Sequence, residues 1–300
     1  MIFKKVCIIG CGLIGSSIAR AIKKNHLAEK VVSSNRSTSV NNKVIELKIV
    51  DDSSTDTKKM VEGSDLIIIA TPLSSYEEVI LKIKDSLKNG AILTDVGSVK
   101  ENVIKIIEKN IPKNISWIPS HPIAGTEDSG PESGFSELFK NRWCILTPSQ
   151  KIKEKDVNLL KNFWEKVGSK VDIMEAKKHD RILAITSHLP HLVAYNIVKT
   201  SLDTQDETNA SIVKYSAGGL RDFTRIAASN PIMWRDIFIQ NQKNTLNMID
   251  KFIENLEELK KAISSKDEKI LENIFTKTKK IRKDIIEAGQ DVKKPDFGRK

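Results

Sequence analysis

The sequence predicts an α/β half followed by an all-helical half. Residues 1–150 alternate short apolar runs with segments whose apolar residues recur at helical spacing, the pattern of a parallel sheet covered by helices on both faces. A glycine-rich turn directly follows the first apolar run, and from about residue 151 the pattern is mainly helical. At roughly 150 residues per domain, we expect two domains, 1–150 and 151–300.

The elements of the first half follow from their apolar patterns. Continuous apolar runs bounded by polar residues predict buried strands, and amphipathic segments predict helices. The predicted strands are Lys4–Ile9, Lys30–Ser34, Asp65–Thr71, Ala91–Asp95, Ile115–Pro119 and Trp143–Thr147. The predicted helices are Leu13–Lys24, Tyr76–Leu87, Val99–Lys109 and a segment that opens at Pro148-Ser149 and runs to Gly168.

The second half carries long helical patterns after a short segment at Lys170–Met174. The predicted helices are Ala176–Ser201, interrupted by Pro190, then Pro231–Ser264 and Asp267–Ala288. Pro231 is a favoured residue for a first helical turn. Long helices of this kind bury their apolar stripe against one another or against a second subunit. The polar, basic residues Asp291–Lys300 are expected to fray.

The charge balance excludes one class of partner. A net charge of +10 invites comparison with nucleic-acid-binding proteins, but those concentrate arginine, often among aromatic residues. Here the lysines are dispersed and aromatic residues make up 5% of the chain, so we expect a solvated lysine coat and no nucleic-acid partner. A positive field still favours the approach of an anionic metabolite.

The expected location is the cytoplasm, with no membrane partner. No apolar run approaches the roughly 20 residues that a membrane span needs, and the first residues lack the pattern of a signal peptide. The three cysteines, Cys7, Cys11 and Cys144, form no CxxC pair, which is typical of a reducing compartment.

A glycine-rich turn joins the first predicted strand to the first predicted helix. It has the GxGxxG spacing, in which the first glycine permits the turn, the second admits a pyrophosphate and the third lets helix and strand pack. The helix N-terminus adds partial positive charge. We expect a Rossmann dinucleotide-binding domain; the alternative is a glycine-rich turn without a ligand. The expected cofactor-binding residues are Gly10, Gly12, Leu13, Ile14 and Gly15, with Thr71 and Pro72 at the end of a neighbouring strand.

The end of the second predicted strand leaves the choice of cofactor open. NAD-binding domains place a carboxylate roughly 20 residues after the glycines, where it holds the ribose 2′-hydroxyl. Here that position carries Asn35-Arg36-Ser37. Asn35 can bond a hydroxyl, whereas Arg36 with Ser37 suits a 2′-phosphate unless Arg36 is a simple surface arginine. The expected cofactor is therefore NAD or NADP.

Two candidate catalytic residues follow the ends of predicted strands. Hydride transfer from an alcohol carbon requires a base for the hydroxyl proton, and histidine suits this role near neutral pH. Of the five histidines, His121 lies at a strand end, where open α/β sheets bind ligands. Ser98 follows another predicted strand and can orient a neighbouring histidine. The competing roles are a structural histidine at His121 and a helix N-cap at Ser98.

The helical half holds candidate substrate-binding residues. His188 and His191 lie one helical turn apart, but no third ligand is arranged with them, so we expect a pocket lining and no metal. Arg221 and Arg225 flank Asp222, and an arginine fork at either position would hold a substrate carboxylate. An internal salt bridge to Asp222 is the alternative.

Several segments occur in an order that resembles one enzyme family. They are GCGLIG (10–15), ATP (70–72), DVGSVK (95–100), HPIAGTE (121–127), SHLPH (187–191), GG-x-RDFTR (218–225) and PIMW (231–234). This order is similar to that of the prephenate/arogenate dehydrogenase family of tyrosine biosynthesis. The resemblance implies a Rossmann domain followed by an all-helical dimerisation domain, and a homodimer. The implied reaction is oxidative decarboxylation of prephenate to 4-hydroxyphenylpyruvate, or of arogenate to tyrosine.

The resemblance also implies roles for individual residues. His121 would accept the proton of the ring 4-hydroxyl, Ser98 would bond this hydroxyl and the histidine, and Arg225 would hold the substrate carboxylate. Further pocket or gating positions are Glu127, His179, His191, Asp222 and Trp234. Two alternatives stay open. One is another two-domain NAD(P) dehydrogenase acting on a β-hydroxyacid, with Lys100 as its catalytic lysine, and the other is a non-catalytic dinucleotide sensor.

Overall fold

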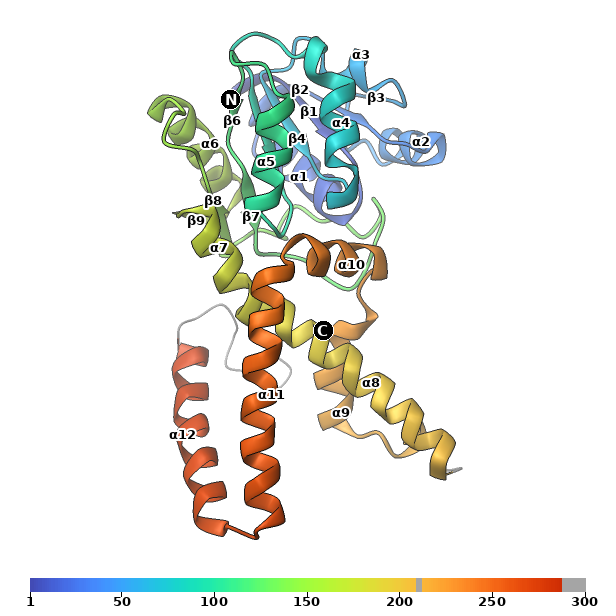
Figure 1. Cartoon of the computed structure of the whole chain (residues 1–300). Helices are drawn as coiled ribbons and strands as arrows, with labels where there is room; N and C mark the ends of the chain where they lie inside the picture. The colour runs from blue at the N-terminus through green and yellow to red at the C-terminus, as the bar shows by residue number, and fades with distance from the viewer. Residues whose placement is uncertain (209–211, 288–300) are drawn as a thin grey trace. The chain divides into compact units, whose positions relative to one another are not determined.

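The computed structural model describes residues 1–208 and 212–287 (Figure 1). The chain separates into two compact units, Met1–Thr245 and a second unit that begins at Leu246. The expectations for Asp291–Lys300 and for a helix end at Ala288 lie outside the described residues. The predicted domain boundary at residue 150 stays a prediction.

The first unit is built on a six-stranded parallel sheet with the strand order β3-β2-β1-β4-β5-β6. Its strands are β1 (Phe3–Ile9), β2 (Ala28–Ser34), β3 (Asp52–Ser54), β4 (Leu66–Ile69), β5 (Ile92–Asp95) and β6 (Ser116–Trp117). The strand order reverses between β1 and β4, and open α/β sheets bind ligands outside the carboxyl ends of the strands at such a reversal. The glycine-rich turn follows β1 at this position.

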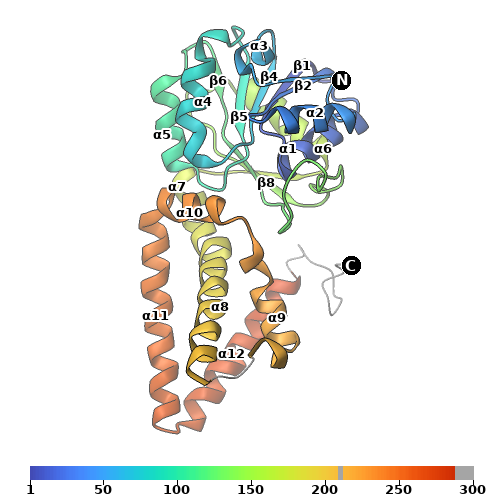
Figure 2. The same cartoon turned by 90° about the vertical axis from the view of Figure 1, so that its right-hand side faces the viewer.

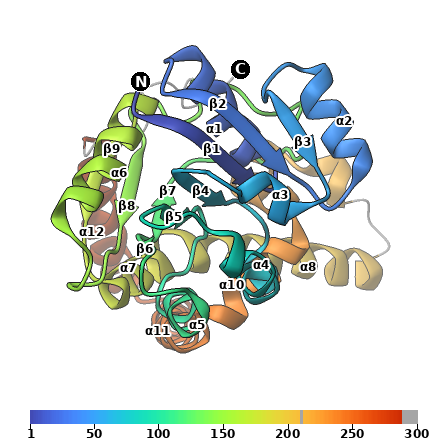
Figure 3. The same cartoon turned by 90° about the horizontal axis from the view of Figure 1, so that it is seen from above.

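Helices cover both faces of this sheet (Figure 3). One face carries α1 (Leu13–Lys24), α2 (Thr38–Glu46) and α6 (Glu154–Val167), and the other carries α3 (Thr57–Val61), α4 (Tyr76–Ile83) and α5 (Glu101–Asn110). Alternate side chains of the central strand β4 belong to the two cores, and all of Leu66–Ile69 is fully buried. A strand buried on both faces needs a continuous apolar run, and the predicted α/β class is confirmed.

The strand predicted at Trp143–Thr147 forms, but in a second sheet. This sheet has the order β7-β8-β9 and contains β7 (Ser120–Pro122), β8 (Trp143–Leu146) and β9 (Lys170–Ile173). β6 offers only two paired residues at the edge of the main sheet, and β8 pairs instead with β7, antiparallel. The predicted opening of α6 at Pro148-Ser149 is wrong, because a turn closed by Ile152 N and Ser149 O precedes the helix, which begins at Glu154.

A helical region completes the first unit. Its segments are α7 (Ala176–Leu183), a π-helical turn (Ala184–His188), α8 (Leu189–Thr208), a 3-10 turn (Ile212–Tyr215), α9 (Gly218–Thr224), a second 3-10 turn (Arg225–Ala228) and α10 (Pro231–Gln240). α9 lies beside α8 in both side views (Figures 1 and 2). Pro190 does not interrupt the helical path as predicted. It lies in the first turn of α8, where the widened π turn before it accommodates its ring and its missing N–H.

The helix predicted from Pro231 to Ser264 is divided at Asn241. This residue leaves the helical conformation, and its side-chain amide donates to the carbonyl oxygen of Asp180 at 2.8 Å. α11 (Gln242–Ser264) follows, and most of it belongs to the second unit together with α12 (Glu268–Glu287). A hydrogen bond from Asp267 N to Ala262 O (2.9 Å) closes the turn between the two helices. Within the described residues, no helix combines the length and the apolar character that crossing a membrane requires.

Candidate active site

The turn between β1 and α1 depends on its glycines for different reasons. Gly10 has φ +93°, and a Cβ there would lie 2.7 Å from the carbonyl oxygen of Ala70 after β4. A Cβ on Gly15 would lie 2.0 Å from the Gly10 carbonyl oxygen, so this glycine lets α1 pack on the turn. A Cβ on Gly12 would meet nothing within 4 Å, and no side chain caps α1 here. The N-terminus of α1 is open to a phosphate, and the turn fits a dinucleotide.

The remaining residues predicted around the pyrophosphate surround this turn. Leu13 and Ile14 begin α1 and turn their side chains into the core, so their contribution to a phosphate site is through backbone N–H groups. Thr71 follows β4, and its hydroxyl accepts a hydrogen bond from Ser75 at 2.8 Å. Pro72 is exposed next to it.

The loop between β2 and α2 divides its residues between two tasks. The side-chain oxygen of Asn35 accepts a hydrogen bond from Cys11 N at 2.6 Å, and its amide donates to Asn41 Oδ1 at 2.9 Å. Asn35 is buried and ties the loop to the glycine turn. Arg36 and Ser37 are exposed beside it, directly before α2. Their side chains are accessible from solution, unlike that of Asn35.

A buried ion pair shapes the loop after β5. The Lys100 ammonium donates to both carboxylate oxygens of Asp95 (2.8 and 2.6 Å) and to Ser120 O (2.7 Å). Burial lowers the pKa of Lys100, and the Asp95 carboxylate opposes this shift. Asp95 also accepts from Gly97 N (2.8 Å) and Ser120 N (3.2 Å). These bonds fix the half-buried Ser98 between the two partners and hold β7 against the carboxyl end of β5.

His121 lies on β7, opposite Ile145 of β8, and is 7% exposed. The preceding residue, Ser120, bonds Asp95 at the carboxyl end of β5, so His121 lies near the carboxyl ends of the main-sheet strands. Its Nδ1 is 2.8 Å from Nε2 of His179 on α7, and Nδ1 of His179 is 2.7 Å from Oδ1 of Asp180. Burial lowers the pKa of His121 well below its usual value, and its neighbours His179 and Lys100 add to this shift. The ring is therefore neutral, and thus a base, near neutral pH.

A second group of rings surrounds the π turn. His188 is buried, and its Nδ1 lies 3.2 Å from the Asn241 amide nitrogen. Burial lowers the pKa of His188 to about 4, and the Asp180 carboxylate opposes this shift. The His191 ring stacks on Trp234 with centroids 3.7 Å apart, and its Nδ1 is 2.9 Å from a backbone carbonyl oxygen one turn earlier. Among the described residues, no group of three or more potential ligands is placed to hold a metal ion.

The predicted carboxylate clamp has a partner within the protein. Arg225 donates to a carboxylate oxygen of Glu127 at 2.9 Å, and the two side chains are 40% and 36% exposed. Burial lowers the pKa of His191, and the positive charge of the Arg225 guanidinium adds to this shift. Asp222 pairs with Arg221 at 3.4 Å on the exposed surface. The internal salt bridge to Asp222 is therefore made by Arg221, and Arg225 bonds a residue of the loop after β7.

Two polar residues of this region were not predicted from the sequence. The Asp180 carboxylate accepts from His179 and from the backbone N–H groups of Lys100 and Glu101 at the start of α5. Asn241 holds His188 and the backbone of Asp180. The adjacent His179-Asp180 pair was a usable signal for the first, whereas nothing in the sequence around Asn241 indicates the second.

Comparison with known proteins identifies the family. The model of the prephenate dehydrogenase nucleotide-binding domain matches residues 18–173, and the model of the prephenate dehydrogenase dimerization domain matches residues 175–277. The chain belongs to the prephenate dehydrogenase family. It is an NAD(P)-dependent oxidoreductase, with a Rossmann sheet at its N-terminus and a helical C-terminal region.

Characterised members of the family are similar over nearly the whole chain. Cyclohexadienyl dehydrogenase of Zymomonas mobilis is 38% identical over 281 residues, 94% of this chain and 96% of the relative. The structure of Aquifex aeolicus prephenate dehydrogenase with hydroxyphenyl propionate and NAD+ has a TM-score of 0.88 at 33% identity, covering 94% of this chain and 98% of that one. Synechocystis arogenate dehydrogenase has a TM-score of 0.78 at 25% identity, covering 94% of this chain and 99% of that one.

Proposed function

We propose that this dehydrogenase catalyses the oxidative decarboxylation of prephenate, of arogenate, or of both. The observation that carries the proposal is the buried, neutral imidazole of His121, held through one ring nitrogen by His179 at 2.8 Å. Its other nitrogen, Nε2, has no hydrogen-bond partner among the described residues. The enzymes that resemble this chain are named for prephenate, arogenate or cyclohexadienyl substrates, which supports the same substrate class here.

The proposed reaction moves one proton to the protein. When bound, NAD(P)+ supplies the acceptor for the hydride that leaves C4 of the cyclohexadiene ring. His121 Nε2 takes the proton of the 4-hydroxyl as the carbonyl forms. The bond between C1 and its carboxylate then breaks, CO₂ leaves, and the electron pair moves through the ring to the C4 oxygen, which takes the proton back from His121 to give an aromatic phenol. The hydride is the only electron pair removed from the substrate, so no further oxidant is needed.

Arg225 is the proposed contact for a substrate carboxylate. Its hydrogen bond to Glu127 uses one guanidinium nitrogen, and the side chain is 40% exposed, so an incoming carboxylate can take the remaining donors. Substrate binding of this type acts equally on the ground state and the transition state, so it lowers KM without raising kcat. Ser98 and His188, His191 and Trp234 are the proposed lining of the same pocket.

The loop between β2 and α2 has no carboxylate that would favour NAD over NADP. The Asn35 side chain is engaged with Cys11 and Asn41, which leaves Arg36 and Ser37 as the proposed contacts of a 2′ substituent. An exposed guanidinium is compatible with a 2′-phosphate and equally with an adenine face. The proposal for the cofactor is therefore NAD or NADP.

The alternative of a β-hydroxyacid dehydrogenase with a catalytic lysine is less well supported. Lys100 Nζ donates three hydrogen bonds, two to Asp95 and one to Ser120 O, and is fully buried. An ammonium group with all its protons engaged has no donor left for a substrate. The other alternative, a non-catalytic dinucleotide sensor, differs from the proposed enzyme only in that it would not turn over substrate.

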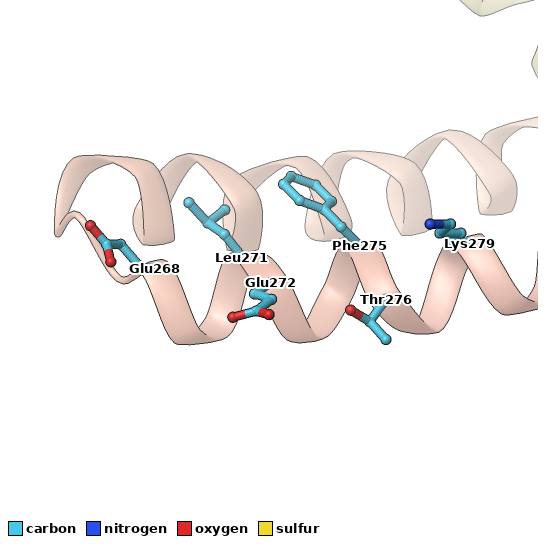
Figure 4. Close-up of a pocket in the computed structure, with 6 residues that line it drawn as sticks. All are labelled: Glu268, Leu271, Glu272, Phe275, Thr276 and Lys279. Carbon is cyan, nitrogen blue, oxygen red and sulfur yellow. The ribbon is translucent and has the colours of Figure 1, made fainter.

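A homodimer is the proposed assembly. The matched dimerization domain supports it, and both helices of the second unit expose apolar side chains. These residues are Leu246, Ile253, Leu256 and Ile263 on α11, and Ile270, Phe275, Ile281 and Ile285 on α12. Figure 4 shows Leu271 and Phe275 one turn apart in a surface hollow of α12, which is also lined by Glu268, Glu272, Thr276 and Lys279. We assign these faces to a second copy of the chain.

The experiment that tests the proposed function is a steady-state assay of both substrates with both cofactors. Reduction of NAD+ or NADP+ is followed by absorbance, and 4-hydroxyphenylpyruvate or tyrosine is identified in the product. Turnover in at least one of the four combinations supports the proposal and names the preferred pair. Cofactor binding without turnover in any of them would favour the sensor.

A further inference from the structure

The structure assigns a positioning role to His179 and Asp180: together they fix which nitrogen of His121 carries its proton. We call the hydrogen-bonded series Asp180–His179–His121 the relay. We infer that it presents His121 Nε2 as a hydrogen-bond acceptor before any ligand binds. The inference rests on the proposed function, because it explains how the proposed base is held ready. It departs from the pocket role expected for His179, whose two ring nitrogens both have protein partners.

The assignment follows from counting donors and acceptors along the chain of three residues. A carboxylate only accepts hydrogen bonds, so Nδ1 of His179, 2.7 Å from Asp180 Oδ1, must carry a proton. Burial lowers the pKa of His179, so this ring is neutral and its Nε2 has a lone pair. His121 Nδ1, 2.8 Å away, must therefore be the donor in the next bond. The remaining nitrogen of a neutral His121 is Nε2, with its lone pair free.

The far end of the relay is anchored to two other elements. The second oxygen of Asp180 accepts from Glu101 N at 2.9 Å, and Oδ1 also accepts from Lys100 N at 2.8 Å, both at the start of α5. Asn241 donates to the Asp180 backbone carbonyl at 2.8 Å. A carboxylate at a helix N-terminus is also favoured by the partial positive charge there. The Asp180 carboxylate is therefore fixed in orientation, and its hydrogen bond to Nδ1 orients the His179 ring.

The surroundings of His121 and His179 keep both imidazole rings neutral until the reaction begins. His179 and Asp180 are 0% and 1% exposed, and His121 is 7% exposed. The charged neighbours of these three residues are Lys100 and its partner Asp95, and the titratable neighbours are His188 and Cys144. When Nε2 of His121 takes the substrate proton, its Nδ1–H continues to donate to His179. The new positive charge then lies two hydrogen bonds from the Asp180 carboxylate, which stabilises it.

Two substitutions of His179 test its two hydrogen bonds separately: the one it donates to Asp180 and the one it accepts from His121. Asparagine reaches only as far as the Nδ1 position, so His179→Asn keeps a donor for Asp180 and removes the acceptor for His121. Glutamine reaches the Nε2 position with its amide oxygen, so His179→Gln restores that acceptor. We expect His179→Asn to lower kcat by about 10²-fold with KM little changed, because much of His121 then carries its proton on Nε2. His179→Gln should stay within roughly tenfold of the parent.

The tautomer itself is measured without substrate. Long-range ¹H–¹⁵N spectra of the full-length protein, with its five histidines labelled, distinguish an Nδ1–H ring from an Nε2–H ring. The signal of His121 is assigned by its loss in His121→Asn. We expect Nδ1–H in the parent protein and in His179→Gln, and a shift toward Nε2–H in His179→Asn. His26→Asn is the matched control, since His26 is exposed at φ +50°, which asparagine tolerates, and no effect is expected.

An Nε2–H signal for His121 in the parent protein would overturn the inference even if no variant folded. An unchanged tautomer in His179→Asn would also overturn it, whatever happened to kcat, because the role of His179 would then be structural. Failure of the proposed function gives a different result: the tautomers behave as expected while no substrate is turned over.

Discussion

Three side chains near the candidate site show how local partners decide what a residue can do. Lys100 is charged and reactive in principle, but all three of its ammonium protons are directed to acceptors in the protein. His121 has one nitrogen held and one open. Arg225 is partly exposed, and its bond to Glu127 uses one guanidinium nitrogen, which leaves the other donors for the proposed substrate carboxylate. The structural lysine, the proposed base and the proposed carboxylate clamp are thus distinguished by hydrogen bonds that cannot be seen in the sequence.

Replacing His121 by asparagine should remove the proposed base and leave the cofactor site intact. We expect kcat to fall at least about 10²-fold, the usual contribution of a positioned general base. The Kd for NAD(P)+ should change little, because the glycine turn belongs to β1 and α1. Stopped-flow or steady-state turnover gives the first quantity and fluorescence titration the second. Unchanged turnover would remove His121 from its proposed role.

The acid limb of the pH profile is expected below the ordinary histidine pKa of about 6.5. Burial lowers the pKa of His121, and His179, Lys100 and His188 lower it further. Since the neutral ring is the base, kcat/KM should stay constant as the pH falls past about 6.5 and decline only when the pH passes the lowered value. The measurement is kcat/KM against pH at constant ionic strength. A limb centred above that ordinary value would contradict the assignment of this group.

Arg225→Ala should act mainly on substrate binding. The loss of a charge-assisted hydrogen bond to a carboxylate, at a partly exposed position, corresponds to a rise in KM of about tenfold or more. The value of kcat should change less, because this contact is made equally in the ground state and the transition state. Arg225→Lys keeps the charge and loses the fork, and should give an intermediate KM. Normal saturation by substrate in Arg225→Ala would refute the clamp.

Elements with a strong apolar pattern were predictable, and elements held by pairing or by distant partners were not. The run at Asp65–Thr71 predicted β4, whose side chains fill both cores. The polar Asp52–Ser54 forms β3 only because it pairs with β2 at the edge of the sheet. α2 was missed for a related reason, since it buries only Asn41 and Val44. The apolar pattern carries no information about such polar, edge-held segments.

The candidate site divides in the same way. The glycine turn was predictable because spacing and flanking elements together specify it. His121 was expected just after a predicted strand, and it lies on β7, which Ser120 bonds to the carboxyl end of β5; the short pairing of β7 with β8 was not predicted. Its partner His179 is 58 residues away in sequence, and no local pattern encodes that contact.

Two glycines of one turn should respond differently to the same substitution. Gly15→Ala places a methyl group 2.0 Å from the Gly10 carbonyl oxygen, so α1 must move and the free energy of unfolding should fall by about 1–3 kcal/mol. Gly12→Ala meets nothing within 4 Å, so the fold should tolerate it while the methyl group occupies the space proposed for the pyrophosphate. Denaturant unfolding and NAD(P)+ titration test the pair. Unimpaired cofactor affinity in Gly12→Ala would contradict the proposed phosphate position.

Across the first unit, the sheet and the helical region contribute different parts of the candidate site. The sheet side supplies the glycine turn, Ser98 and His121, and the helices supply His179 and the rings of the π turn. Several contacts fix one part on the other: among them, Asp180 bonds the start of α5, and Asp236 accepts from Ser74 N at 3.1 Å. The proposed base and its positioning residues meet only when both parts are folded together.

The second unit should hold two copies of the chain together. On α11, Leu246 and Ile253 are seven residues apart, as are Leu256 and Ile263, so these exposed side chains share one face. We expect a mass of about 67 kDa by light scattering, twice 33.6 kDa. Two aspartates on this face, in Ile253→Asp/Leu256→Asp, should separate the copies, because each would bury an unpaired charge in the interface. Lys251→Asp, exposed on the opposite face of α11, is the matched control and should stay dimeric. A monomeric parent protein, or an aspartate variant that kept the mass of a dimer, would show that this face is not the interface.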